Sequence, residues 1–378
     1  MAPNRLARAL ETARRGGRVI LDLTESNPTR CGFDYAIPAL GEAREYEPDP
    51  LGLPAARQAV AQYYCDRGIA VRPQQILMTA GSSEAYGYLF RLLANPGDAV
   101  LVPRPSYPLF EFLARINDVE AAPYALDADH AWRIDLASVE TQLSEHARAV
   151  VVVNPNNPTG SLLASEDRER LVEICRRRGL ALIADEVFLD YGVESAAGRA
   201  SSLAGESRAL TFTLNGLSKL AALPQMKLGW MVAAGPEALL ADAMRRLEVI
   251  ADTYLSVGTP VQHALPALLA GSGAVRRQIL DRCGANLRHL DEQTAGQALL
   301  RRLPVEAGWS VVLRVPSIQT DEEWALELLE RDGVLIHPGH FFDFASEGYL
   351  VASLITRPEV FREGMSRLLT RVQQRAGP

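Results

Sequence analysis

The chain has 378 residues, of which 48% are hydrophobic and 22% charged, and its formal net charge at pH 7 is −7. This is the composition of a globular protein large enough for two domains, and the acidic balance argues against a nucleic-acid-binding surface. The N-terminus lacks the apolar core of a signal peptide and no uninterrupted apolar run approaches about 18 residues, so we expect a cytoplasmic protein without a membrane span.

The first elements in chain order indicate a parallel sheet. From about residue 75, short apolar runs alternate with helical periodicity, as in SEAYGYLFRLLA (83–94) and ASEDRERLVEICRRRG (164–179). Strand–helix alternation of this kind predicts an α/β fold with a mostly parallel central sheet wrapped by helices. The predicted buried strands are QILMTAG (75–81), DAVLVP (98–103), AVVVVN (149–154), LALIAD (180–185) and ALTFTL (209–214).

The pattern changes after about residue 270. A long helical stretch leads to WSVVLRV (309–315), a helix over 321–333, the short runs VLIHPG and YLVASLI, and a terminal helix. This is an α+β layout. We therefore predict a large domain over residues 46–270, a smaller domain over 271–378, and an N-terminal segment, residues 1–45, that packs on the smaller domain.

Lysine is scarce and clustered. Of the 39 basic residues only Lys219 and Lys227 are lysines, and both lie in TLNGLSKLAALPQMKLGW (213–230). Codon bias towards arginine explains the scarcity but not the clustering. Arginine stays protonated in proteins, whereas lysine can lose its proton and attack a carbonyl to form a Schiff base. A lysine with that task cannot be replaced by arginine.

Three further polar segments follow predicted strands. Ser82 and Ser83 start a helix, where hydroxyls and free N–H groups make an anion site. Asn157, in NPNNPTG (154–160), is a possible side-chain donor, and Asp185 is either a structural ion-pair residue or aimed at a buried cation. Open α/β sheets bind ligands at the carboxyl ends of their strands. The four cysteines, by contrast, lie far apart and lack the spacing of a zinc site, so we expect no metal.

Three motifs follow one another along the chain: NPNNPTG, the DE of IADEVF, and SK…LGW. With these motifs the chain resembles the fold-type I pyridoxal-phosphate enzymes, in particular the class I/II aminotransferases. The spacing of the motifs also fits that family, with 28 residues from Asn157 to Asp185 and 34 from Asp185 to Lys219. The resemblance covers the chain from about Tyr46 to its C-terminus. It implies pyridoxal 5′-phosphate as cofactor, and a reaction that moves the amino group of an L-amino acid to a 2-oxo acid.

The resemblance also implies a role for each matched residue. Lys219 holds the cofactor as a Schiff base and shuttles the substrate α-proton, and Asp185 pairs with the pyridinium nitrogen. Asn157 donates to the phenolic oxygen, and Tyr107 in RPSYPLF stacks on the ring. Tyr46 reaches the phosphate from the second subunit of a homodimer. The remaining phosphate ligands are Ser82, Ser83, Ser218 and Lys227, and the substrate-binding residues are Ser26, Asn27 and Arg357.

Four positions depart from the family pattern. Lys227 replaces an arginine, Ser26 stands where glycine is usual, and Phe188 replaces a tyrosine that donates to the phenolic oxygen. Val351 stands where an arginine usually binds the substrate carboxylate. Arg357 lies just beyond the same strand and is the nearest replacement, although TRPE (356–359) resembles a capping box that would put it in a first helical turn. The alternative candidates are Arg314 and Arg30.

These departures keep alternatives open. Another pyridoxal-phosphate reaction on the same fold, such as a C–S or β-lyase or a cyclising enzyme of natural-product biosynthesis, shares the early chemical steps, so the fold does not choose among them. A non-catalytic sensor of the kind found in some bacterial regulators would need a basic helix-turn-helix extension, for which we expect no room.

Overall fold

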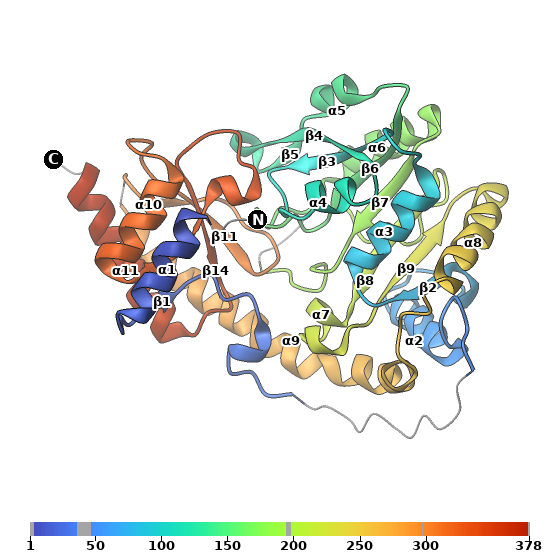
Figure 1. The fold of residues 1–378 in the computed structure, drawn as a ribbon, viewed down its shortest axis with the longest axis horizontal. Coiled ribbons are helices and arrows are strands. Elements are labelled where there is room, and N and C mark those ends of the chain that lie inside the picture. The colour runs from blue at the N-terminus through green and yellow to red at the C-terminus, as the bar shows by residue number, and fades with distance from the viewer. Residues whose placement is uncertain (1–3, 36–46, 194–197, 297, 377–378) are drawn as a thin grey trace.

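The computed structural model describes residues 4–35, 47–193, 198–296 and 298–376. Two bodies stand side by side in it: a large one built on an eight-stranded sheet, and a smaller one that contains the first and the last described helices (Figure 1). Among the described helices, none combines the length and the apolar character needed to cross a membrane.

The large sheet has the strand order β2-β9-β8-β7-β6-β3-β4-β5. The four ladders that join β8 through β7, β6 and β3 to β4 are parallel, and the three at the margins are antiparallel. The fold class predicted from the sequence is therefore confirmed. The strands are β2 (Ile76–Thr79), β3 (Ala99–Arg104), β4 (Glu120–Asp127), β5 (Arg133–Ile134), β6 (Ala147–Val153), β7 (Ala181–Asp185), β8 (Thr211–Gly216) and β9 (Gly229–Ala234).

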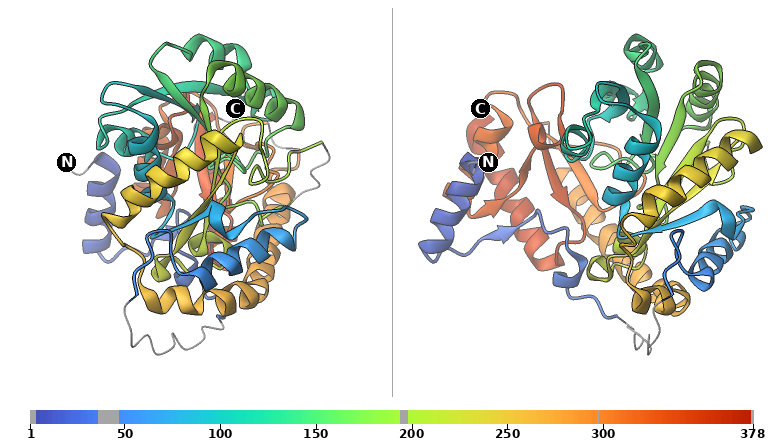
Figure 2. Two further views of the ribbon diagram at one scale, coloured as in Figure 1. Left: turned by 90° about the vertical axis from the view of Figure 1, so that its right-hand side faces the viewer. Right: turned by 45° about the vertical axis from the view of Figure 1, so that its right-hand side comes forward.

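Helices cover both faces of this sheet, as the two views of Figure 2 show. Successive strand residues point to opposite faces, so Val151 packs in the layer of α3, α4 and α8, whereas Val150 packs against α5 and α6. The central strands are buried on both faces, which explains their continuous apolar runs. The helices are α2 (Pro54–Cys65), α3 (Ser82–Leu93), α4 (Phe110–Arg115), α5 (Leu136–Gln142), α6 (Ser165–Arg178), α7 (Leu217–Leu220) and α8 (Glu237–Asp252), with 3₁₀ turns η2 (Pro73–Gln75), η3 (Ala128–His130) and η4 (Pro224–Met226).

The smaller body is built on the antiparallel sheet β10-β11-β14-β13 and the parallel pair β1-β12. Strand β1 from the N-terminus pairs with β12, and α1 contacts α10. Its elements are α1 (Arg5–Arg15), β1 (Leu21–Asp22), η1 (Pro28–Arg30), β10 (Arg301–Arg302), β11 (Ser310–Arg314), α10 (Asp321–Glu327), the π-helical turn η5 (Leu328–Asp332), β12 (Val334–Leu335), β13 (His337–Pro338), η6 (Gly339–Phe342), β14 (Tyr349–Ser353) and α11 (Pro358–Ala376).

One long helix, α9 (Thr259–Thr294), belongs to both bodies. It contacts α2 of the large body and α11 of the smaller one (Figure 1). The boundary predicted between residues 270 and 271 therefore falls inside a continuous helix, and the division into 46–270 and 271–378 stays a prediction.

The capping box expected in TRPE is wrong. Helix α11 begins at Pro358, and the buried hydroxyl of Thr356 has no hydrogen-bond partner among the described residues. The carbonyl of Arg357 accepts the first helical bond, from the N–H of Phe361. Proline suits the first helical position because its φ is already helical and its missing N–H has no partner to lose there. Arg357 is thus the residue before the helix.

Candidate active site

A cavity opens at the carboxyl ends of the central strands. Strands β6, β7 and β8 end at Val153, Asp185 and Gly216, and all three residues line it. Parallel strands that end at one edge of a sheet bring their following loops together. Of the residues singled out in the sequence, those that line this cavity are Ser82, Ser83, Tyr107, Asn157, Asp185, Phe188, Ser218 and Lys219.

Lys219 follows β8 on the short helix α7. Burial lowers the pKa of its ammonium group, against the opposing effect of the Asp185 charge. Its Nζ lies 5.4 Å from the ring centroid of Phe188 and 5.1 Å from that of Trp309. The hydroxyl of Tyr191 donates to the Lys219 carbonyl at 2.7 Å and so fixes the backbone beneath the side chain.

Asp185 is a buried carboxylate at the end of β7. The Tyr86 hydroxyl donates to it at 3.1 Å and the Val187 N–H at 3.2 Å. Desolvation raises the pKa of Asp185 to about 6, and these two hydrogen bonds and Lys219 oppose the rise. A carboxylate in such surroundings gains from a cationic partner, because an isolated charge is costly to bury.

Asn157 and Tyr107 line the cavity from loops that follow β6 and β3. The Ser310 hydroxyl donates to Asn157 Oδ1 at 3.5 Å, so the amide nitrogen is the group available to donate towards a ligand. The Tyr107 side chain is 45% exposed, so it is not an ordinary core residue.

Three glycines bring the start of α3 close to the end of β8. Gly216 pairs with Gly229 in the β8–β9 ladder, and a Cβ on Gly229 would lie 3.0 Å from the Asn215 carbonyl oxygen and 3.1 Å from the Gly81 Cα. Backbones can approach this closely only without side chains between them. The first N–H groups of α3 have no intrahelical partner. With Ser82 and Ser83 they form an anion site next to the strand that leads to Lys219.

Other residues singled out in the sequence do not line this cavity. Lys227 is exposed and adopts a left-handed backbone conformation with φ of 49° at the end of η4. Ser26 is exposed, and the Asn27 side chain accepts hydrogen bonds from Thr29. Tyr46 lies outside the described residues.

The arginine candidates also lie outside the cavity lining. The Arg357 guanidinium lies beside Gly32, Arg314 lies over the Tyr349 ring with its Cζ 4.2 Å from the centroid, and Arg30 is exposed at the end of η1. Val351 is buried in an apolar cluster that includes Trp132. Within the described part of the chain, Lys219 is the only lysine or arginine in the cavity lining.

Several residues of the site were missed from the sequence. Trp309 and Ser310 come from the smaller body, and Tyr86 lies on the inner face of α3. Tyr86 could have been found, because it lies one helical turn after Ser82 and so shares a face with it. Trp309 and Ser310 carry no local signal, since their strand packs against Asn157 only in the folded chain.

Comparison with known proteins agrees with this geometry. The model of the family "Aminotransferase class I and II" matches residues 35–362. The glutamate-pyruvate aminotransferase AlaA of Haemophilus influenzae is 30% identical over 361 residues, which span 91% of this chain and 88% of the relative. The chain belongs to the class I and II aminotransferases.

Further relatives support the same family. The alanine aminotransferase of Mycobacterium tuberculosis is 28% identical over 364 residues, 90% of this chain and 82% of the relative. The solved structure of an alanine aminotransferase from Pyrococcus furiosus superimposes with a TM-score of 0.88 at 23% identity, over 98% of this chain and 96% of that one, which supports the fold.

This aminotransferase uses pyridoxal 5′-phosphate to move an amino group between an amino acid and a 2-oxo acid. The donor set of the cavity fits that cofactor. The helix start with its serine hydroxyls suits a phosphate, the Lys219 amine suits an aldehyde, and the buried Asp185 suits a ring-nitrogen cation. The Asn157 amide is a donor for an anionic oxygen.

Proposed function

We propose that Lys219 binds the cofactor covalently and moves the substrate proton in an aminotransferase that takes its amino group from an L-amino acid. The observation that carries the proposal is the convergence of Lys219, Asp185, Asn157 and the α3 helix start on one cavity. All four follow the ends of different strands, β8, β7, β6 and β2, so their meeting follows from the sheet and not from sequence proximity.

Pyridoxal phosphate, when bound, supplies a conjugated ring that withdraws electron density from the α-carbon of the amino acid. Lys219 suits both of its tasks because burial lowers the pKa of its ammonium group, which makes the neutral amine easier to reach. A neutral amine attacks a carbonyl carbon and, when free, accepts a proton at Nζ and returns it. The Phe188 and Trp309 rings lie beside Nζ and add to the apolar surroundings of that nitrogen.

Asp185 holds a negative charge at the closed end of the cavity. The Tyr86 hydroxyl and the Val187 N–H orient it, and its charge favours a protonated ring nitrogen. Ser82, Ser83 and Ser218 offer hydroxyls to the phosphate, and Tyr107 offers a flat ring to stack on. The phosphate role of Lys227, and the substrate contacts of Ser26, Asn27 and Arg357, stay predictions from the sequence.

The natural substrates are proposed from the relatives. Curated relatives are named for glutamate, pyruvate and alanine, and these are the first donors and acceptors to test. We also propose a cytoplasmic homodimer in which the partner subunit's Tyr46 contacts the phosphate, an arrangement that the resemblance of YEPDPLGLPAAR to the family supports.

The test is to mix the cofactor-loaded enzyme with each common amino acid and to follow the absorbance of the cofactor. Conversion to the pyridoxamine form, with release of one equivalent of 2-oxo acid, identifies amino-group transfer and its donor. Release of ammonia with the 2-oxo acid, without lasting change of the cofactor, would instead identify a lyase. Val351 and Phe188 are the residues that favour this second reaction, because they replace an arginine expected at the substrate carboxylate and a tyrosine expected at the phenolic oxygen of the cofactor.

A further inference from the structure

The surroundings of the Lys219 amine include two aromatic faces. Its Nζ lies over the Trp309 ring, 5.1 Å from the centroid, and over the Phe188 ring, 5.4 Å from the centroid. Both distances are within the about 6 Å over which a ring face attracts a cation. The same nitrogen enters no hydrogen bond or ion pair with any residue that the structure describes. The contacts that it does make are with rings.

Packing holds these rings in place. The Trp309 centroid lies 5.3 Å from that of Phe188 and 5.1 Å from that of Tyr191, and both pairs meet edge to face at 75°. Trp309 and Phe188 are buried, at 3% and 7% exposure. The indole nitrogen of Trp309 has no hydrogen-bond partner among the described residues, so neighbouring rings and not a polar contact orient the indole. The Tyr191 hydroxyl donates to the Lys219 carbonyl, which ties the lysine backbone to the same group of rings.

Main-chain contacts join the two segments that carry the rings. Trp309 precedes β11 of the smaller body, whereas Tyr191 follows β7 of the large one. Gly192 and Ala307 form an antiparallel bridge, and the Gly308 N–H donates to the Tyr191 carbonyl at 2.8 Å. The Trp309 ring is thereby fixed relative to the loop that follows β7, although it comes from the other body.

Asp185 at the end of β7 is the charged group that acts on the Lys219 amine. Its charge raises the pKa of that amine, and burial, the larger effect, lowers the pKa. Tyr86 on α3 and Tyr107 after β3 face the Asp185 carboxylate, and Tyr191 binds the Lys219 backbone. Burial raises the pKa of all three tyrosines, so they add no charge at neutral pH.

We propose that the faces of Trp309 and Phe188 hold the protonated amine of Lys219 whenever that amine is not bonded to the cofactor. Trp309 acts through Lys219 and is therefore a positioning residue contributed by the smaller body. The proposal deepens the proposed function, and it rests on that function only for the covalent role of Lys219.

A ring contact suits an amine that accepts a proton and returns it. A ring face attracts an ammonium group through its quadrupole, but it has no carboxylate oxygen to bind the proton. A carboxylate at hydrogen-bond distance would hold the same proton more strongly, because hydrogen bonds between two charged groups are the stronger kind. The rings thus stabilise the charge and leave the proton available.

The small number of lysines makes the amine directly observable. In a Lys227→Arg background Lys219 is the single lysine of the chain, so incorporation of lysine labelled with ¹⁵N at Nζ and ¹³C at Cε gives one side-chain signal. Its chemical shift as a function of pH in the full cofactor-free chain gives the pKa of Lys219. The measurement does not depend on activity.

Fluorinated tryptophan tests the ring contact without changing the packing. Fluorine withdraws electron density from the ring face and so weakens its attraction for a cation. Incorporation of 5-fluorotryptophan and then of 5,6,7-trifluorotryptophan should lower the pKa of Lys219 stepwise, by about 0.5 in all. In Trp309→Phe, the matched control, the same incorporation should have no effect. An unchanged pKa in the Trp309 chain, or an equal fall in the control, would overturn the proposal.

Phe188→Leu tests the second ring. Leucine keeps an apolar side chain beside the amine but has no π face, so the pKa of Lys219 should again fall by about 0.5. An unchanged or raised pKa in this variant would overturn the proposal, since it names both rings.

Two further measurements connect the contact with the reaction. In the enzyme loaded with pyridoxamine 5′-phosphate the Lys219 amine stays free, and trifluorination should lower its pKa as it does without cofactor. A fall seen only in the cofactor-free chain would overturn the proposal. If borohydride mapping finds no pyridoxyl group on Lys219 while the fluorine effect is intact, the proposed function is overturned and the ring contact stands. A pyridoxyl group on Lys219 without any fluorine effect overturns the ring contact alone.

Discussion

At the scale of single residues, the two lysines differ in their surroundings. Lys219 lines the cavity beside the Phe188 and Trp309 rings, whereas Lys227 is exposed at a turn. Burial lowers the pKa of the Lys219 ammonium group and with it the cost of a neutral amine. Their difference is one of burial and not of residue type.

Borohydride reduction tests this difference. Reduction of the cofactor-loaded enzyme followed by peptide mass mapping should place a pyridoxyl group on Lys219. Lys219→Ala should fold, because the loss is chemical, but should carry no covalent cofactor and transfer no amino groups. Lys227→Ala is the matched control and should keep the label. A label on Lys227 in the wild type would contradict the assignment of roles.

Glu186, next to Asp185, is a second buried carboxyl and titrates near neutrality. It is fully buried, and Ser202 and the Leu203 N–H are its hydrogen-bond partners, at 2.5 Å and 2.7 Å. Desolvation raises its pKa from 4.5 to about 8, although both hydrogen bonds oppose the rise. Between these pH values the folded chain holds a proton that the unfolded chain releases, so a rise in pH favours unfolding.

Replacement of Glu186 by glutamine should remove this dependence of the stability on pH. The free energy of unfolding of Glu186→Gln relative to the wild type should rise between pH 5.5 and 7.5, by at most about 1.4 kcal/mol per pH unit. Urea titrations of the cofactor-free enzyme at the two pH values measure it. A difference between the two proteins that does not change with pH would mean that Glu186 stays ionised when buried.

At the scale of elements, the close approach of β8, β9 and the α3 start builds the site. Gly216 and Gly229 face each other across the ladder, and Gly81 lies against Gly229. The atoms around a Cβ at Gly229 are backbone atoms, which cannot rotate away as a flexible side chain does. The cavity geometry therefore depends on a contact between main chains.

Gly229→Ala should disturb both stability and cofactor binding. Forcing these backbones apart should lower the free energy of unfolding by about 1–3 kcal/mol, and it should weaken cofactor binding because the phosphate site moves away from Lys219. Gly87→Ala is the control, since Gly87 lies inside α3 and a Cβ there meets nothing closer than 3.7 Å. It should be neutral or slightly stabilising. An unchanged cofactor affinity in Gly229→Ala would show that the glycine contact does not position the site.

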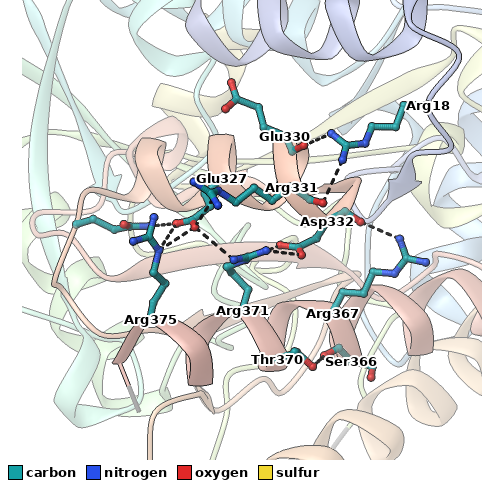
Figure 3. A network of polar contacts seen from close by, with 11 residues as sticks. Arg18, Glu327, Glu330, Arg331, Asp332, Ser366, Arg367, Thr370, Arg371 and Arg375 are labelled. Carbon is teal, nitrogen blue, oxygen red and sulfur yellow. Dashed lines mark hydrogen bonds and ion pairs between the residues drawn. The ribbon is translucent and has the colours of Figure 1, made fainter. Parts of the chain in front are cut away.

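At the scale of the whole molecule, an ionic network joins the chain ends in the smaller body (Figure 3). Arg371 and Arg375 on α11 bind Asp332 and Glu327, and the Arg18 side chain near the N-terminus donates to the carbonyls of Glu330 and Arg331. Burial raises the pKa of Glu327, but hydrogen bonds from Arg375 and Gln319 outweigh it, so the pKa is lowered. The stabilisation that the ionised Glu327 carboxylate provides is therefore present above pH about 4.5 and is lost as the pH falls further.

Glu327→Gln should lower the free energy of unfolding by about 1–3 kcal/mol at pH 7, because the buried partner of several guanidinium groups loses its charge. The deficit should shrink below pH about 4.5, where the wild-type carboxyl also becomes protonated. Glu363→Gln is the control, since Glu363 and its partner Arg367 are both exposed, and it should change stability by less than about 0.5 kcal/mol. Denaturant titrations at pH 7 and pH 4 give both numbers, and equal deficits at the two pH values would contradict the role of the Glu327 charge.

The parallel character of the central strands and the meeting of their loops were predictable from the sequence, whereas the strand order was not predicted. Strands β6, β7 and β8 are continuous apolar runs because both of their faces are buried, and such runs are visible locally. Once these strands are parallel, Asn157, Asp185 and Lys219 follow their carboxyl ends and must share one edge. The residues nearest the cavity were therefore found without the fold.

Only the tertiary structure decided which cationic, aromatic and serine residues surround that edge. Ser310 contacts Asn157 across 153 positions of sequence, and the N–H of Ser106 in the large body donates to the carbonyl of Phe342 in the smaller one. No local pattern encodes such contacts, because they depend on how two separately built sheets face each other. Lys227 and Arg357 illustrate the limit: residue type and spacing suggested charge near the ligand, and their roles there stay predictions, because both side chains are exposed and lie outside the cavity lining.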